Sequence, residues 1–156
     1  MTREEFIKVL DEKGYSYEIE GDKIVVTHGK KGTGLDDHIY LDSLVPNVIF
    51  ANKGMVKLDN ITSLPYGIEF RNGGEITGLG IHKLEYPLNF QNGGLIQFHR
   101  LEKINPYVEF NNKGGVYLKN FAAIKGKKGR PLGYPLIKGI FDGRLLNLMI
   151  KRGMFI

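Results

Sequence analysis

The feature that most constrains the fold of this chain is a period of 20 residues that runs from residue 48 to residue 124. Written in steps of 20, the sequence places similar residues in the same columns. Four of these columns hold Val48, Ile68, Leu88 and Val108; Phe50, Phe70, Phe90 and Phe110; Asn52, Asn72, Asn92 and Asn112; and Gly54, Gly74, Gly94 and Gly114. A fixed period of this kind indicates a repeat architecture in which each unit stacks on its neighbours and buries a continuous core.

The spacing of apolar residues inside each unit predicts short β-strands. Apolar side chains recur at every second residue, at 48 and 50 and again at 56 and 58, which is the period of a strand with one buried face. Between them lies Asn-Gly-Gly or Asn-Lys-Gly, which we expect to form a sharp turn through residues with positive φ. A second bend is expected at Pro65, Pro87 and Pro106, because proline interrupts a strand ladder. Two strands and two bends close one coil.

The sequence therefore predicts a mainly β, single-domain β-solenoid of about four to five coils of 20 residues each. The phenylalanine column is expected in the core, because the columns that accompany it are apolar. The asparagine column is expected to be structural, as a ladder of hydrogen-bonded side chains at the turn.

One stretch of the repeat resembles a known sequence family. Ile-Thr-Ser-Leu-Pro-Tyr-Gly-Ile-Glu-Phe-Arg-Asn-Gly-Gly, residues 61–74, is similar to the repeat LTSLPEGVEFNNGG of small, mostly uncharacterised phage and bacterial proteins that are described as leucine-rich-repeat-like. The resemblance extends over about residues 39–124 and implies a repeat fold and an origin in a phage or mobile element. It implies no active-site residues. A true leucine-rich repeat has a different order of leucines and asparagine and a helical segment in each unit, so a β-solenoid is favoured over a horseshoe.

The ends of the chain are expected to cap the solenoid within one domain, residues 1–156. Residues 1–38 form the N-terminal cap: a short amphipathic helix over 4–10 with a capping box from Thr2 and Glu5, a hairpin over 15–27, and a Gly/Lys/Asp-rich loop over 28–38. Residues 39–124 form the solenoid. Residues 125–156 form a basic loop and a C-terminal helix over 144–152, which Gly153 closes.

The residue types that carry most catalytic and metal chemistry are absent or scattered. Cysteine is absent, which excludes disulfides and thiolate chemistry. The four histidines, His28, His38, His82 and His99, do not stand at metal-ligand spacing. Asp36-Asp37-His38 is the one local cluster of acid and histidine, and a solvated turn is the expected role. No enzyme activity, metal or cofactor is therefore predicted.

The chain has a formal net charge of +5 and a pI of about 9.3, so an acidic partner is compatible with its surface. The candidate partner contacts, or nucleic-acid contacts, are the cations of the two glycine-rich loops: Lys125, Lys127, Lys128 and Arg130, with Lys30 and Lys31. Flexible cations among glycines suit phosphate groups or an acidic protein groove. A solubilising loop is the alternative.

These observations favour a non-catalytic macromolecule-binding module. The leading hypothesis is a phage or mobile-element protein that binds and inhibits a host or defence protein, for example a CRISPR effector. Nucleic-acid binding through residues 125–130 and a structural role in a virion are the alternatives. A nucleoprotein complex is a further candidate partner. No signal-peptide pattern or apolar run of about 20 residues occurs, so a location in the cytoplasm of a bacterial or phage-infected cell, without membrane contact, is expected. The oligomeric state stays open.

Overall fold

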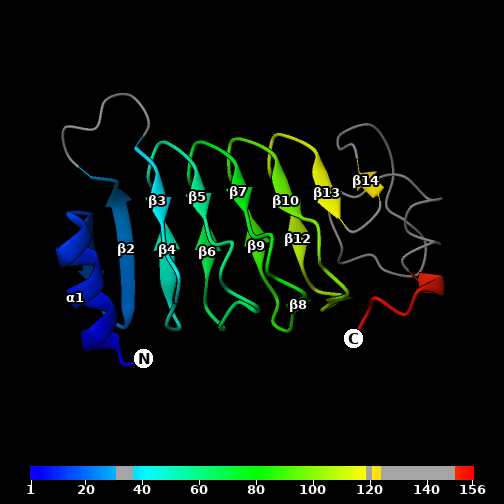
Figure 1. Ribbon diagram of the computed structural model, residues 1–156, viewed down its shortest axis with the longest axis horizontal. Helices are drawn as coiled ribbons and strands as arrows, with labels where there is room; N and C mark the ends of the chain where they lie inside the picture. The colour runs from blue at the N-terminus through cyan, green and yellow to red at the C-terminus, as the bar shows by residue number, and fades with distance from the viewer. Residues whose placement is uncertain (31–36, 119–120, 124–149) are drawn as a thin grey trace.

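The computed structural model describes residues 1–30, 37–118, 121–123 and 150–156, and these form a β-solenoid with a helix against its N-terminal end (Figure 1). Successive coils advance along the long axis of the molecule, so that strands one repeat apart lie side by side. We name the coils by residue number: coil 1 is 48–67, coil 2 is 68–87, coil 3 is 88–107 and coil 4 begins at 108. The prediction of a mainly β solenoid of about four to five coils is confirmed, with about four coils in the structure.

The N-terminal helix, α1 (Arg3–Lys13), covers the predicted segment 4–10 and extends beyond it at both ends. Thr2 accepts a hydrogen bond from the backbone N–H of Glu5, and the Glu5 carboxylate accepts one from the Thr2 N–H, which completes the predicted capping box. Gly14 ends the helix in the left-handed conformation, with φ of +73°. The helix is longer than the predicted 4–10 by one residue at its start and three at its end.

A hairpin joins the helix to the solenoid. Strands β1 (Ser16–Glu20) and β2 (Lys23–His28) pair antiparallel around the predicted turn at Gly21. β2 also pairs in parallel with the first strand of coil 1, with Ile24 opposite Val48. The parallel stack therefore starts inside the hairpin, one strand earlier than the sequence repeat that begins at residue 39.

The coils build two main sheets of parallel strands. The first contains β2, β4 (Val48–Phe50), β6 (Glu69–Phe70), β9 (Asn89–Phe90) and β12 (Glu109–Phe110). The second contains β3 (Ile39–Tyr40), β5 (Val56–Lys57), β7 (Ile76–Thr77), β10 (Ile96–Phe98) and β13 (Val116–Leu118). Partners on neighbouring coils occupy the same column of the sequence repeat, as in Val56 opposite Ile76. The side chains that the repeat places inward fill one core between the sheets.

A third side of the coil corrects the prediction of two strands per unit. Strands β8 (Lys83–Leu84) and β11 (Lys103–Ile104) pair in parallel, and Ser63 forms an isolated parallel bridge with Lys83. These strands have two residues each, and one residue of each pair is buried. So short a segment shows no alternation, which is why the sequence pattern did not indicate it.

The glycines of the turn serve a purpose other than the one predicted. The described residues with positive φ include Gly14, Gly21, Gly67 and Gly153, and none lies in an Asn-Gly-Gly or Asn-Lys-Gly turn. Instead, a Cβ on Gly94 would lie 2.8 Å from the backbone N of Glu75 and 2.9 Å from the carbonyl carbon of Gly74, in the coil before it. Glycine is required there because two backbones approach closely, not because the chain needs a left-handed residue.

The asparagine column is buried and structural, but its hydrogen bonds do not run from side chain to side chain. Nδ2 of Asn92 donates to the backbone carbonyl of Gly74 in the previous coil, at 3.1 Å, and to those of Gly94 and Leu95 in its own turn, at 2.9 and 3.4 Å. Asn72 makes the equivalent set of bonds. Each amide thus ties its own turn to the coil before it.

The solenoid ends differently from the prediction that it runs to residue 124. Strand β14 (Phe121–Ala123) turns back and pairs antiparallel with β13, so it does not continue the third side of the coil. The C-terminal segment takes that position: Phe155 forms a parallel bridge with Ile104. Of the predicted helix over 144–152, residues 144–149 lie outside the described part; Ile150 and Lys151 are helical, and Gly153 follows them with φ of +64°.

Candidate functional site

Most of the predicted basic contacts fall outside the described residues. Lys31, Lys125, Lys127, Lys128 and Arg130 lie in segments of which the structure gives no account. Lys30 is described and exposed, two residues after the end of β2. Strand β14, which precedes residue 125 in the sequence, lies at the opposite end of the solenoid from β2 (Figure 1). The two predicted basic loops therefore leave the described fold at opposite ends.

The repeat positions lie in the core and present no binding surface. Phe50, Phe70, Phe90 and Phe110 have no exposed surface, and their rings stack in one row. The asparagines of the turn are 0–5% exposed. The prediction that both columns are structural agrees with this placement.

Within the Asp36-Asp37-His38 cluster, the Asp37 carboxylate joins two backbone segments through hydrogen bonds. The Asp37 carboxylate accepts hydrogen bonds from the backbone N–H groups of Gly29 and Lys53, and it lies 3.4 Å from Nδ1 of His28. Burial raises the pKa of Asp37, but the two backbone hydrogen bonds and His28 outweigh it, and the pKa lies below its ordinary value. With a side chain 17% exposed, Asp37 is a half-buried clamp and not the solvated turn that we predicted.

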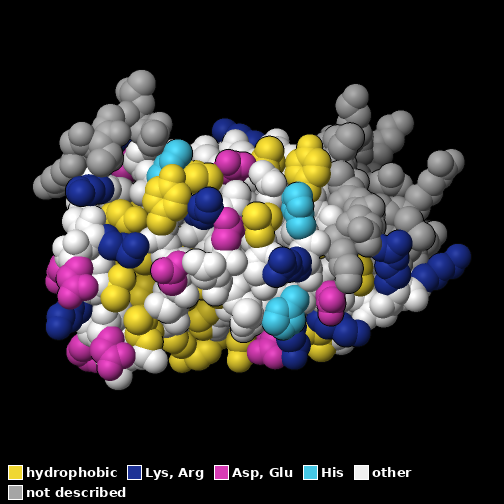
Figure 2. All heavy atoms as spheres, viewed as in Figure 1, with side chains coloured by type: hydrophobic (Ala, Val, Ile, Leu, Met, Phe, Trp, Pro, Cys, Tyr) yellow, Lys and Arg dark blue, Asp and Glu magenta, His cyan; other side chains and the backbone are white. Residues whose placement is uncertain are grey.

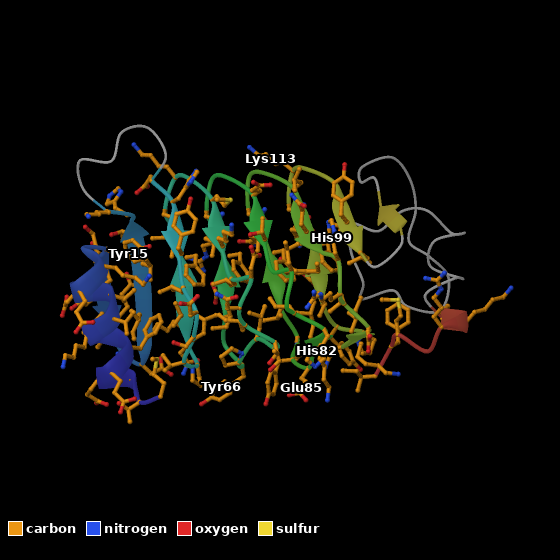
Figure 3. All side chains as sticks on the ribbon, viewed as in Figure 1. Tyr15, Tyr66, His82, Glu85, His99 and Lys113 are labelled. Carbon is orange, nitrogen blue, oxygen red and sulfur yellow. The ribbon has the colours of Figure 1, made fainter. Side chains whose placement is uncertain are left out.

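A row of exposed tyrosines follows the proline bends of coils 1 to 3. Tyr66, Tyr86 and Tyr107 are 53%, 38% and 55% exposed, whereas the four phenylalanines of the repeat column are fully buried. The rings of Tyr66 and Tyr86 meet edge to face, with centroids 6.0 Å apart. Tyr66 and Glu85 both lie at the lower margin of the view in Figure 3. We call these three side chains the tyrosine row.

The sequence contained a signal for the tyrosine row that the predictions did not use. Tyr66 and Tyr86 occupy one column of the repeat, beside Pro65 and Pro87, and Tyr107 follows Pro106. The prolines identified the bend, and a bend at the surface exposes its neighbours. Large aromatic residues next to such a bend are therefore candidates for a binding surface.

A groove of about 420 Å³ adjoins the tyrosine row. Its walls include Asp42 and Ser43 before coil 1, Thr62 and Ser63 in coil 1, and Glu85 and Tyr86 in coil 2. The groove exists because the chain before coil 1 has a shortened bend. Ile39 pairs with Val56 across less than one full repeat of chain, whereas a full repeat separates Val56 from its next partner, Ile76. The shorter segment leaves one side of coil 1 uncovered.

The charged groups of the groove are carboxylates. Asp42 accepts a hydrogen bond of 2.8 Å from Nδ2 of Asn60, and Glu85 pairs with Lys83 at 2.5 Å. The side chains that line the groove include no lysine or arginine. The surface is therefore suited to neutral or basic groups more than to anions.

Histidines and cations are also exposed on coils 2 and 3. His82 and His99 lie on the face toward the viewer in Figure 3, and Arg100 and Lys103, which follow His99 in the sequence, are exposed. Figure 2 shows Lys, Arg and His side chains at several places on the face toward the viewer. The C-terminal Lys151 and Arg152 are exposed as well.

Neither a metal-binding cluster nor a membrane-spanning helix occurs in the part of the chain that the structure describes. No group of three or more His, Asp or Glu side chains there is arranged to hold a metal ion. None of the helices within those residues is long and apolar enough to cross a bilayer.

Comparisons of the chain with protein-family models, with curated proteins and with solved structures gave no significant match. Its function is therefore inferred from the chain's own residues.

Proposed function

We propose that the chain is a non-catalytic protein-binding module that contacts its partner through the tyrosine row and the adjacent groove. The observation that carries the proposal is the exposure of Tyr66, Tyr86 and Tyr107 on three successive coils. Tyrosine is enriched at protein interfaces because its ring adds a large contact area at a small entropic cost and its hydroxyl forms hydrogen bonds at the rim.

The solenoid provides a firm support for this surface. The tyrosines stand on bends whose flanking residues Leu64, Leu84 and Ile104 are buried in the core. Parallel ladders join each coil to the next on the main sheets, so the spacing of the three side chains is fixed by the backbone. A pre-organised aromatic surface loses little conformational freedom when a partner binds.

The resemblance to repeat proteins of phages suggests what the partner is. We propose that it is a host or defence protein whose action the binding inhibits, as in anti-CRISPR proteins. The support for this step is the resemblance over residues 39–124 together with the surface described above.

Quantitative pull-down from a bacterial lysate, followed by titration of the captured protein, tests the proposal. The variant carries Tyr66→Ala, Tyr86→Ala and Tyr107→Ala, and the matched control is Tyr117→Ala, which removes a tyrosine that is 43% exposed on the second sheet. We expect the triple variant to weaken binding by more than about tenfold, the loss typical of interface hot spots. Equal binding of the wild type and the triple variant would contradict the proposal.

Nucleic-acid binding is a second candidate, favoured by the distribution of charge. Residues 124–149 contain four lysines, two arginines and one aspartate, a net charge of +5 that equals the charge of the whole chain. The cations of the face with Arg100 and Lys103 add to it. Neutralising Lys125, Lys127, Lys128 and Arg130 should reduce a salt-dependent shift of DNA or RNA, with a slope that falls by about 0.9 per lost phosphate contact. Salt-insensitive or absent binding would exclude this candidate.

A further inference from the structure

The groove beside coil 1 exposes an unpaired edge of the third side of the solenoid. On this side β11 pairs with β8, and β8 pairs with Ser63 of coil 1. Before coil 1 the series stops: among the described residues, no backbone hydrogen bond joins residues 42–46 to residues 60–65. The chain returns to the ladder only where Asn47 N–H donates to the Tyr66 carbonyl.

Two N–H groups on this edge face the groove without an acceptor from the described chain. In coil 3 the N–H groups of Glu102 and Lys103 both donate to the carbonyl of His82 in the coil before, at 2.9 and 3.1 Å. The residues that stand two repeats earlier are Thr62 and Ser63. By the repeat, their N–H groups point to the same side, where the shortened bend supplies no carbonyl.

Pro65, two residues after Ser63, also fits a strand edge that has no neighbouring strand. Asn105 N–H donates to the carbonyl of Leu84 in coil 2. The equivalent residue of coil 1 is Pro65, which has no N–H to donate. Proline is tolerated at a sheet edge because no ladder bond is lost there. The sequence of coil 1 thus fits an edge that this chain does not extend.

The charges of the groove favour a neutral acceptor for the Thr62 and Ser63 N–H groups. A carboxylate or phosphate would approach two carboxylates, Asp42 and Glu85, in a groove that no lysine or arginine lines. A backbone carbonyl carries no net charge and accepts the same two hydrogen bonds. An extended polypeptide presents such carbonyls in a row, and a basic side chain on it would be attracted to the Asp42 carboxylate, since Glu85 already pairs with Lys83.

The molecule uses the same device at the other edge of this side. Its C-terminal segment, distant in the sequence, lies along β11: Ile104 N–H donates to the Met154 carbonyl at 2.5 Å, and Ile156 N–H donates to the Ile104 carbonyl at 3.0 Å. Met154 is 4% exposed in that position. A short extended segment is therefore sufficient to occupy an edge of this third side.

We propose that an extended segment of a partner protein, carrying a basic side chain, adds as a strand to the Thr62–Ser63 edge in the groove. The inference rests on the proposed protein-binding function and names its mode. A backbone carbonyl of the segment accepts hydrogen bonds from the Thr62 and Ser63 N–H groups. The His82 carbonyl accepts the equivalent bonds from Glu102 and Lys103 in coil 3. Tyr86 and Pro65 flank the added strand. This is β-strand addition, in which main-chain hydrogen bonds supply affinity and side-chain contacts supply specificity.

Selection from a displayed library of random linear dodecapeptides tests the inference, with two substitutions at one residue. Ser63→Pro removes an N–H that has no partner within the described residues, and Ser63→Ala keeps the N–H while it removes the hydroxyl. Selected peptides should bind the wild type and Ser63→Ala alike and bind Ser63→Pro about tenfold more weakly, as expected for the loss of one ladder hydrogen bond. Basic residues should be enriched among them. Thermal unfolding establishes that Ser63→Pro is folded.

Amide hydrogen exchange of the wild type with a selected peptide gives a second readout, which does not depend on any variant. The Thr62 and Ser63 amides should become protected when the peptide binds. Selected peptides that bind Ser63→Pro as well as the wild type, or that leave these amides unprotected, would overturn strand addition, as would a library that yields no binding peptide. Capture of a protein partner that depends on the tyrosine row would then still support the proposed function, so the two failures are distinguishable.

Discussion

Phe70 and Phe90, which stand one coil apart, stack with their ring centroids 5.2 Å apart and their ring planes inclined by 12°. The separation is close to the spacing of about 4.8 Å between paired strands, so the backbone ladder places one ring on the next. Phe50 and Phe110 extend the row at both ends, with separations of 5.3 and 5.2 Å. Phe98 crosses from the second sheet and meets Phe90 edge to face. Each ring is thus held mainly by the coils on either side of it.

The first prediction concerns this row. Phe90→Ala should lower the free energy of unfolding by about 3–5 kcal/mol, because it removes the stacking contacts with Phe70 and Phe110 and leaves a cavity at a fully buried site. Urea denaturation followed by circular dichroism measures the loss. The control is Gln91→Ala, at the exposed next residue, which should change stability by no more than about 0.5 kcal/mol. A loss below about 1 kcal/mol for Phe90→Ala would contradict the stacked row.

The second prediction separates close approach from backbone conformation at the turn glycines. Gly94→Ala should destabilise the fold by about 1–3 kcal/mol, because its Cβ would lie within 2.9 Å of the backbone of coil 2 and the two coils must move apart. Lys113→Ala, at an exposed position of the next turn, is the control and should have little effect. Thermal unfolding of the two variants provides the comparison. Equal melting temperatures would show that the coils are not tightly apposed there.

The sequence was sufficient to predict the parts of the fold that repeat. Columns of similar residues occur because parallel strands in register bring the same side chain to the same place in each coil, as with Val56 and Ile76. The pairing of Ile39 with Val56 agrees with the predicted start of the solenoid at residue 39. The helix cap at Thr2 follows a local rule that involves only Glu5.

The parts that the sequence did not indicate lack a local pattern. The Lys83–Leu84 strand is too short to show alternation. The pairing of Phe155 with Ile104 joins segments that are distant in the sequence and leaves no periodic trace. A glycine column fits positive φ and close approach equally well, so the reason for Gly94 became clear only from the neighbouring backbone. The groove arises from a missing piece of chain, the shortened bend before coil 1, and the sequence shows the deletion without showing what it uncovers.

A third prediction tests the asparagine that ties the coils together. Asn92→Asp should destabilise the fold by about 3–5 kcal/mol at neutral pH, because it places a charged acceptor against three carbonyl oxygens at a fully buried site. Protonation of the carboxyl restores one donor, so the loss should be smaller in acid. The matched control is Gln91→Glu, which adds a carboxylate at the exposed residue next to Asn92. Urea titrations at two pH values test whether the destabilisation by Asn92→Asp is smaller in acid. A destabilisation that does not depend on pH would argue against these hydrogen bonds.

Asp37 supplies the fourth prediction. Its pKa is lowered in the folded state from an ordinary value of 3.8, so its ionised form stabilises the fold above that value, and the contribution is lost as the pH falls through the lowered pKa. Asp37→Ala should therefore cost about 1–3 kcal/mol at neutral pH, since two backbone N–H groups lose their acceptor. The difference in the free energy of unfolding between wild type and Asp37→Ala should become smaller at acidic pH. The control is Asp22→Asn, at the exposed hairpin turn, which should change the free energy of unfolding by no more than about 0.5 kcal/mol at neutral pH.

The last prediction concerns the tail that completes the third side. Deletion of residues 154–156 exposes the edge of β11 and removes Met154 from the core, so it should lower the free energy of unfolding by about 2–3 kcal/mol. The control is Ile156→Ala, because that side chain is 58% exposed and its backbone N–H still bonds to Ile104. Amide exchange should localise the change: the Ile104 amide, which donates to the Met154 carbonyl, loses its protection in the deletion and keeps it in the control. Retained protection at Ile104 in the deletion variant would mean that another segment covers β11, and the analogy between the two edges of this side would no longer support strand addition at coil 1.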